Sequence, residues 1–267
     1  MITHRNCPFR NVALKSEHII PIMTGPIIGD AFGSMLCEFA RSQSPGVAEI
    51  IERDDGYIHV QRPDRYFAAP SAWAQFERDA LELAGDSVLD VGCGAGRFAL
   101  ALQARDVAVT ALDVSAGACE VCRRRGVRDV VHGQVAQLAQ AGRRYDTFLL
   151  MGENLGLLES TAMAPVLLAG LAAIARPGAR IIGHGADPKA ADEALARYLR
   201  RDRGPGRLAG ELTIRLRHRD LATEWFGYLL CGPDELGELT RGTGWRLARA
   251  QYADQANYLA VIDLDPS

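Results

Sequence analysis

The sequence predicts an α/β protein with a doubly wound, mostly parallel seven-stranded sheet and an antiparallel C-terminal strand. Between residues 86 and 186, short apolar runs alternate with helical patterns, which is typical of a parallel sheet covered by helices on both faces. A turn with three glycines at alternate positions follows the first apolar run. Two β-rich runs near the end of the chain, at 245–252 and 258–264, predict a closing antiparallel pair.

Composition limits the classes of function. The chain has 267 residues, a net charge of −3 and a 48% share of hydrophobic residues, as expected for one large globular domain or a core with additions. This charge gives no electrostatic indication of a nucleic-acid or membrane partner. No apolar run has the length of a membrane span, and the start lacks a signal-peptide pattern, so we expect a cytoplasmic protein.

Residues 1–85 predict an arm and a cap ahead of the core. The expected elements are an irregular arm at 1–26, a helix at 27–42, a hairpin of 48–51 and 57–60, a loop at 62–70, and a helix at 71–83 capped by Ser71. Trp73 falls on the apolar side of the last helix. This segment is long enough to cover a neighbouring cleft.

The core is expected at 86–186. Its predicted strands are 88–91, 107–112, 129–132, 147–151 and 180–183, and its predicted helices are 97–104, 116–125 and about 162–175. An insertion follows at 187–231, with a helical pattern at 188–198, an exposed loop at 200–207 and an inserted β-hairpin of 211–219 and 223–230. The core resumes at 232–267 with a helix at 233–241 that has Pro233 in its first turn.

The turn after the first strand carries the strongest functional signal. Its sequence, Val-Leu-Asp-Val-Gly-Cys-Gly-Ala-Gly-Arg, runs from Val88 to Arg97 and leads into a helix. Glycines let a ligand approach the backbone, and the helix N-terminus offers free N–H groups to it. A dinucleotide fingerprint would have its third glycine at Arg97. Asp113 ends the next strand, about 20 residues on, where a carboxylate suits a ribose diol.

This Asp-x-Gly-x-Gly-x-Gly motif, with Asp113 after the second strand, resembles class I S-adenosylmethionine (SAM)-dependent methyltransferases. The N-terminal cap and the insertion resemble those of bacterial small-molecule methyltransferases, including natural-product enzymes. The resemblance covers about 86–264, apart from the insertion. It implies a Rossmann-like fold, SAM as the cofactor, S-adenosylhomocysteine as the product and no metal. Another Rossmann-like nucleotide binder is the alternative.

The resemblance also implies which residues contact the cofactor, since ligands bind at the carboxyl ends of the strands in such sheets. The expected cofactor-binding residues are Tyr66, Asp90, Gly92, Cys93, Gly94, Asp113, Val114, Gln134, Val135, Met151 and Gly152. Gln134 stands near the position where the family usually has an acid that contacts the adenine amino group.

His184 and Glu153 follow the fifth and fourth strands and are the candidate catalytic residues, to be used as a base if the acceptor must lose a proton. For each, a structural hydrogen bond or a cofactor contact is the alternative. Asn154, Trp225 and Tyr228 are the candidate substrate-binding residues, and the insertion is expected to form part of the acceptor pocket.

We therefore expect transfer of a methyl group from SAM to an O, N or C atom of a small molecule, with a role in secondary metabolism. A protein or nucleic-acid methyltransferase and a non-catalytic SAM- or nucleotide-binding module are the alternatives. A homo-oligomer is left open. The six cysteines include a C-x-x-C at Cys119 and Cys122, but no second ligand pair for zinc, so packed thiols are expected.

Overall fold

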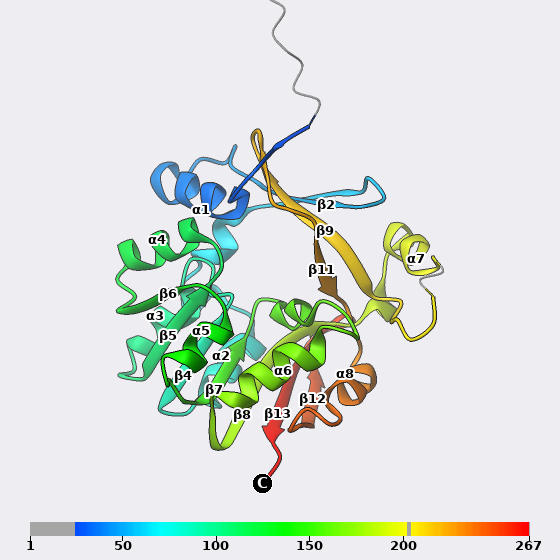
Figure 1. The fold of residues 1–267 in the computed structure, drawn as a ribbon. Helices are drawn as coiled ribbons and strands as arrows, with labels where there is room; N and C mark the ends of the chain where they lie inside the picture. The colour runs from blue at the N-terminus through cyan, green and yellow to red at the C-terminus, as the bar shows by residue number, and fades with distance from the viewer. Residues whose placement is uncertain (1–24, 202–203, 267) are drawn as a thin grey trace, which may run out of the picture.

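The computed structural model describes residues 25–201 and 204–266, and it contains two sheets (Figure 1). The larger, seven-stranded sheet has the order β12-β13-β8-β7-β4-β5-β6. Its strands are β4 (Ser87–Val91), β5 (Ala108–Asp113), β6 (Asp129–His132), β7 (Tyr145–Leu150), β8 (Ala175–Ala186), β12 (Trp245–Tyr252) and β13 (Asn257–Leu264). Strands β4 to β8 pair in parallel, whereas β13 is antiparallel to β8 and to β12. The predicted fold class is confirmed.

Helices cover both faces of this sheet (Figure 1). They are α2 (Gln75–Glu82), α3 (Arg97–Gln103), α4 (Ala116–Arg125), α5 (Val135–Gln140), α6 (Ala164–Ala173) and α8 (Pro233–Thr240). One core cluster joins the sheet to α5, α6 and α8 through Leu138, Leu168 and Leu236. A second cluster joins the opposite face to α2 and α3 through Leu81 and Leu102. The described residues also form 3₁₀ segments at Pro63–Tyr66, Pro70–Ala72, Asn154–Leu158 and Pro188–Ala190. The first two precede α2, and the last precedes α7 (Glu193–Leu199).

The N-terminal cap and the insertion share the second sheet, which the sequence did not predict. Its strands are β1 (Ile27–Ile28), β2 (Glu49–Arg53), β3 (Ile58–Gln61), β9 (Glu211–His218), β10 (Leu221–Ala222) and β11 (Phe226–Leu229). Both expected hairpins form, as β2 with β3 and as β9 with β11. Strand β2 then pairs with β9, with Ile51 opposite Leu216. Segments about 160 residues apart therefore build one wall above the main sheet.

Helix α1 (Ala31–Ser42) attaches the cap to the core. Asp30 caps α1 by accepting from the Gly33 N–H at 2.8 Å. The same carboxylate accepts from the Ser115 hydroxyl and from the Gly117 N–H at the start of α4. A Cβ at Gly117 would lie 2.6 Å from the Gly33 backbone, so glycine is required where the two helices meet.

Several predicted boundaries are wrong. The helix expected from Ser71 begins at Gln75, because Pro70 starts a separate 3₁₀ turn and Ala74 is the N-cap residue. The helix expected at 27–42 begins at Ala31, since residues 27–28 pair with β10 instead. Helix α5 was missed. Most of the irregular arm predicted at 1–26 lies outside the described part of the chain, because the description begins at residue 25. Residues 202–203 of the predicted loop also lie outside it.

Within residues 25–201 and 204–266, no helix has the length and apolar character needed to cross a membrane.

The shared carboxylate of Asp30 predicts a coupling between cap and core. Asp30→Ala should lower the free energy of unfolding by about 1–2 kcal/mol, because it removes a helix cap and two further acceptor contacts. Urea denaturation followed by circular dichroism measures this. Ser34→Ala, one turn into α1, serves as the control. A loss in Asp30→Ala no larger than in the control would contradict the coupling.

Candidate functional site

Side chains from neighbouring segments lie closely against the glycine turn after β4. Gly92 and Gly94 have φ angles of +70° and +54°. A Cβ at Gly92 would lie 2.7 Å from the amide nitrogen of Asn154, and one at Gly94 would lie 3.3 Å from the Tyr66 ring. Asn154 donates from Nδ2 to the carbonyls of Val91 and Gly92, both at 2.9 Å. Asn154 therefore supports the glycine turn from the loop after β7.

Asp113, at the end of β5, holds the same turn from the other side. Its Oδ2 accepts from the Gly94 N–H and its Oδ1 accepts from the Ser115 N–H, both at 2.9 Å. Burial raises the pKa of Asp113 to about 6, although the two backbone donors oppose that shift. A carboxylate oxygen has a second acceptor position, so these bonds leave Asp113 able to accept from a ligand as well.

Asp90 is the unusual group of the site. It is 2% exposed, and its Oδ2 is a buried polar side-chain atom without a hydrogen-bond partner among the described residues. Burial raises its pKa to about 7, while the nearby Arg97 guanidinium lowers it in part and the Asp113 charge adds to the rise. Buried polar atoms are nearly always paired, so this oxygen indicates a missing partner such as a ligand.

The other residues expected near the cofactor lie around this turn and along the same edge of the sheet. Val114 follows Asp113 and is 68% exposed, an open apolar surface beside a buried carboxylate. Gln134 is the exposed N-cap residue of α5, and Val135 is buried in the core. Cys93 is buried, with its sulfur 3.6 Å from that of Cys122. Cys119 and Cys122 are fully buried, which agrees with the packed-thiol interpretation, whereas Cys37 is half-buried.

The loop after β7 continues the site. Met151 is buried, while Gly152 and Glu153 adopt left-handed conformations with φ of +75° and +69°. A glutamate in this region is strained, and such strain gathers at functional sites. The loop is held at both peptide groups of Glu153. Its N–H donates to His184 Nδ1 at 3.0 Å, and its carbonyl accepts from the Tyr228 hydroxyl at 2.8 Å.

Both ring nitrogens of His184 are engaged. Nδ1 accepts from the Glu153 N–H, which leaves Nε2 to donate to the Asn257 side-chain oxygen at 3.1 Å. Burial lowers the pKa of His184, although the Glu153 charge opposes the shift. A neutral imidazole with neither nitrogen free is suited to holding the loop. The geometry thus favours the structural alternative for His184 over a catalytic base.

A further buried carboxylate, Glu49 on β2, was missed by sequence reasoning. It is 4% exposed, accepts from the Tyr66 hydroxyl at 2.9 Å, and accepts from Gln61 at 2.7 Å. Burial raises its pKa, and Tyr66, Arg65 and Gln61 oppose that rise. Its charge also interacts with that of Glu153. The alternating pattern of β2 would have placed Glu49 on the same face as Ile51, but only the fold shows that this face is covered.

The structure brings Tyr66, Glu153, His184 and Tyr228 together with Arg65 and Glu49, since their charges or dipoles interact across one space. Trp225 is not brought there. It is 40% exposed and stacks on Arg215, which pairs with Glu52 on the outer face of the second sheet. Residues 25–201 and 204–266 contain no group of His, Cys, Asp or Glu that could hold a metal ion.

Residues 88–178, from the first core strand into the start of β8, match a family model described as a methyltransferase domain. No curated protein matches the chain.

Solved methyltransferases share this fold over most of the chain. A SAM-dependent methyltransferase from Bacteroides fragilis, in complex with S-adenosyl-L-homocysteine, is 24% identical with a TM-score of 0.74, covering 88% of this chain and 94% of its own. The CcbJ methyltransferase of Streptomyces caelestis is 18% identical with a TM-score of 0.57, covering 89% and 98%. The glycopeptide N-methyltransferase MtfA, also solved with S-adenosylhomocysteine, is 18% identical with a TM-score of 0.52, covering 74% and 91%. These likenesses extend the fold assignment to the cap and insertion.

The raised pKa of Asp90 predicts a specific dependence of stability on pH. Its pKa is about 7 in the folded chain, against a reference value of 3.8, so the folded state retains a proton that the unfolded state has lost. The free energy of unfolding of the ligand-free protein should therefore fall as pH rises from about 4 to about 7. Above that range the ionised Asp90 costs on the order of 4 kcal/mol.

Asp90→Asn should remove this share of the pH dependence, and the variant should gain stability relative to the parent at pH 8 but much less at pH 5. Urea denaturation at both pH values measures it. Because the pKa of Asp113 is also raised, to about 6, the free energy of unfolding falls further as pH rises toward that value, in the parent and in the variant alike. An equal stability difference at the two pH values would show that Asp90 is not held protonated.

Proposed function

We infer that the chain is a SAM-dependent methyltransferase that transfers a methyl group to an O, N or C atom of a small molecule. The observation that carries this inference is the buried Oδ2 of Asp90, which has no hydrogen-bond partner among the described residues and lies beside a glycine turn with a left-handed backbone at Gly92 and Gly94. A ligand that donates hydrogen bonds, or brings positive charge, satisfies that oxygen. The cationic methionine part of SAM offers both.

The residues present fit the rest of the cofactor. Asp90 and the Gly92–Gly94 turn would hold the methionine part and the sugar. Asp113, which keeps acceptor capacity beyond its two backbone bonds, would accept from the ribose hydroxyls. The exposed Val114 would pack on the adenine. Gln134, Val135, Met151 and Gly152 would complete the adenine and sulfur ends, with Tyr66 closing the methionine end over Gly94.

When bound, SAM supplies a methyl group that its positive sulfur has already activated. The protein then has to hold the acceptor close and in line and to exclude water, which supplies most of the acceleration in such a displacement. The wall formed by the second sheet can do this, since Tyr228 on β11 bonds directly to the loop after β7. Arg65 and Tyr66 line the same space from the cap.

Glu153 is the better candidate for a base, for acceptors that must lose a proton. Its strained backbone is fixed by His184 and Tyr228, and the charge of its side chain interacts with those of Arg65 and Glu49. We assign His184 the role of a positioning residue. Asn154 supports the glycine turn, and we assign it an indirect effect on the acceptor through the position of that turn.

A small-molecule acceptor suits a site closed by the chain's own cap and insertion. The neighbour MtfA is named as a glycopeptide N-methyltransferase, which supports a natural-product acceptor and a place in secondary metabolism. Free, buried thiols suit the reducing cytoplasm.

Methyl-tritiated SAM and the full chain, incubated with a bacterial extract, test the acceptor class. Label in the small-molecule fraction supports the proposal. Label confined to protein or nucleic acid would indicate a protein or nucleic-acid methyltransferase instead. SAM binding without any transfer would indicate a non-catalytic SAM-binding module.

Asp113→Ala should weaken SAM binding by roughly 1–3 kcal/mol, because the ribose loses its acceptor and the Gly94 N–H loses its support. Isothermal titration calorimetry with SAM measures this. Asp129→Ala, at the amino end of the neighbouring strand β6 and away from the carboxyl ends of the strands, is the matched control and should bind SAM normally. Normal affinity in a folded Asp113→Ala variant would remove Asp113 from the cofactor site.

Glu153→Gln and His184→Ala separate a base from a positioning residue. Glu153→Gln should lower kcat and remove the acid limb of the pH–rate profile for an acceptor that must lose a proton. His184→Ala should lower kcat by about tenfold or more through misplacement of the loop, yet keep that limb, with SAM affinity unchanged. The profiles are measured with the labelled acceptor from the extract. Loss of the limb in His184→Ala alone would make His184 the base.

A further inference from the structure

A cavity of about 420 Å³ lies beside the site, under the second sheet. Its wall combines the inner face of that sheet with the end of β8 and with α7. The aliphatic residues that line it are Ile51, Ala186, Ala190, Ala191, Leu195, Leu212, Ile214, Leu230 and Ala256. Its size and largely apolar lining are those of a small-molecule site.

Three elements lead from the site into this cavity. On β2, Glu49 and Ile51 lie on the same face, and Arg53 follows about 13 Å further along the strand than Glu49. On β8, Ala186 lines the cavity two residues after His184, again on the same face.

The third element is the β9–β11 pair. Tyr228, which bonds to the Glu153 carbonyl, lies directly opposite Leu212 of β9, and Leu212 lines the cavity. Since side chains of opposed residues in an antiparallel pair share a face, the site and the cavity are adjoining parts of one space.

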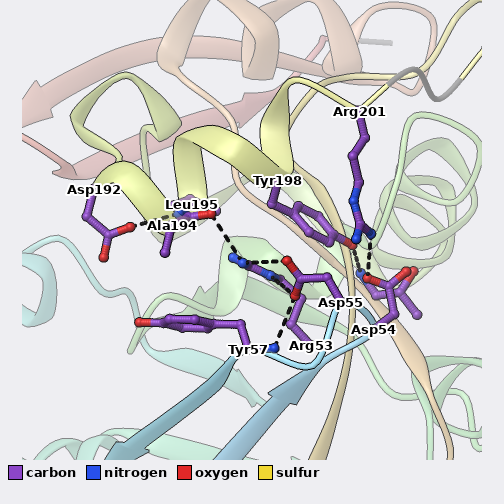
Figure 2. Close-up of polar contacts among 10 residues, drawn as sticks. Arg53, Asp54, Asp55, Tyr57, Asp192, Ala194, Leu195, Tyr198 and Arg201 are labelled. Carbon is purple, nitrogen blue, oxygen red and sulfur yellow. Dashed lines mark hydrogen bonds and ion pairs between the residues drawn. The ribbon is translucent and has the colours of Figure 1, made fainter.

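The charged groups in the wall of the cavity already have partners (Figure 2). Arg53 is 6% exposed and donates two hydrogen bonds to Asp55, at 2.8 and 2.9 Å, and a third to the Ala194 carbonyl at 3.3 Å. Its guanidinium also packs against the rings of Tyr57 and Tyr198.

On the core side, the buried carboxylate of Asp187 accepts from the Tyr252 hydroxyl and from the Lys189 N–H. His59 and Asp192 are exposed at the rim of the cavity. Among the described residues, the interior thus offers aliphatic surface and no unpaired buried charge, which disfavours an ionic ligand and favours an uncharged apolar one.

We propose that this cavity binds an uncharged, apolar part of the methyl acceptor, so that the acceptor is an elongated molecule with its reacting group beside Glu153 and its apolar part against Ile51, Leu212 and Ala186. This inference rests on the proposed methyltransferase function. It names the substrate class, which the glycine turn and its carboxylates do not define.

Linear 1-alkanols from 1-butanol to 1-octanol are the probes, titrated into the full chain saturated with S-adenosylhomocysteine and followed by calorimetry. Affinity should rise about fourfold for each added methylene until the cavity is filled. 1-Octanol should also inhibit methyl transfer competitively with the acceptor labelled in the extract.

The matched variants are neighbours on β2. Ile51→Trp fills the cavity and should weaken 1-octanol binding at least tenfold, whereas Ile50→Trp points to the outer face and should leave it unchanged. Binding of S-adenosylhomocysteine should be normal in both. Should Ile51→Trp fail to fold, Ala256→Trp fills the cavity from the β12–β13 turn.

Affinity independent of chain length, or equal effects of Ile50→Trp and Ile51→Trp, would overturn the proposal. These results leave the methyltransferase function standing if SAM binding and methyl transfer persist. The other outcome is that alkanols bind to the protein and S-adenosylhomocysteine does not. It would overturn the methyltransferase function, and with it the assignment of the cavity to a methyl acceptor.

Discussion

The glycine turn at the end of β4 depends on two side chains that come from the neighbouring strands. Asp113 after β5 accepts from the Gly94 N–H, and Asn154 after β7 donates to the carbonyls of Val91 and Gly92. The turn is therefore braced on both sides without any side chain of its own filling the space above it. This bracing requires β4 to lie between β5 and β7, which is the order the parallel sheet provides. The position of the site and the topology of the sheet follow from the same constraint.

The second sheet gives this open edge a wall made from two distant segments. Its central pairing, β2 with β9, joins the N-terminal cap to the insertion after β8. The cap is anchored to α4 through Asp30, while the insertion is anchored to the β7 loop through Tyr228. Because each segment is attached to the core separately and to the other by a strand ladder, the wall is fixed in position over the carboxyl ends of the strands. In the proposed methyltransferase function, an acceptor bound by this wall would be held in a fixed position relative to the carboxyl ends of the strands, as an in-line displacement requires.

The core of the fold could be predicted from the sequence because its signals are local. The apolar runs, the glycine turn and the closing strand pair each occupy a short window, and the helix Ala116–Arg125 was placed correctly to the residue. The burial of Glu49 and the presence of the cavity could not be predicted. Both depend on the pairing of β2 with β9, which lie about 160 residues apart in the sequence. Asn154 was expected to bind substrate. Its contact with Gly92 could not be predicted, because this contact depends on how the loop after β7 folds back over β4. Trp225 looked like a pocket residue from its type, yet its neighbour Arg215 places it on the outer face.

The electrostatics of Asp90 connect the fold to ligand binding. Strand β4 is buried on both faces, so its last polar residue enters an environment in which an unpaired carboxylate is unfavourable, and the folded chain keeps it protonated up to about pH 7. Arg97 lies close enough to lower that pKa, but its guanidinium is paired with Glu77 and packed against Phe98, so it does not complete the neutralisation. A cationic ligand at the glycine turn would supply the missing charge and draw Asp90 into its ionised form. Binding of such a ligand is therefore coupled to proton release near neutral pH, and a neutral or anionic nucleotide would gain no such benefit. That asymmetry is a physical reason for this turn to select a sulfonium-bearing cofactor with an ammonium group over a dinucleotide.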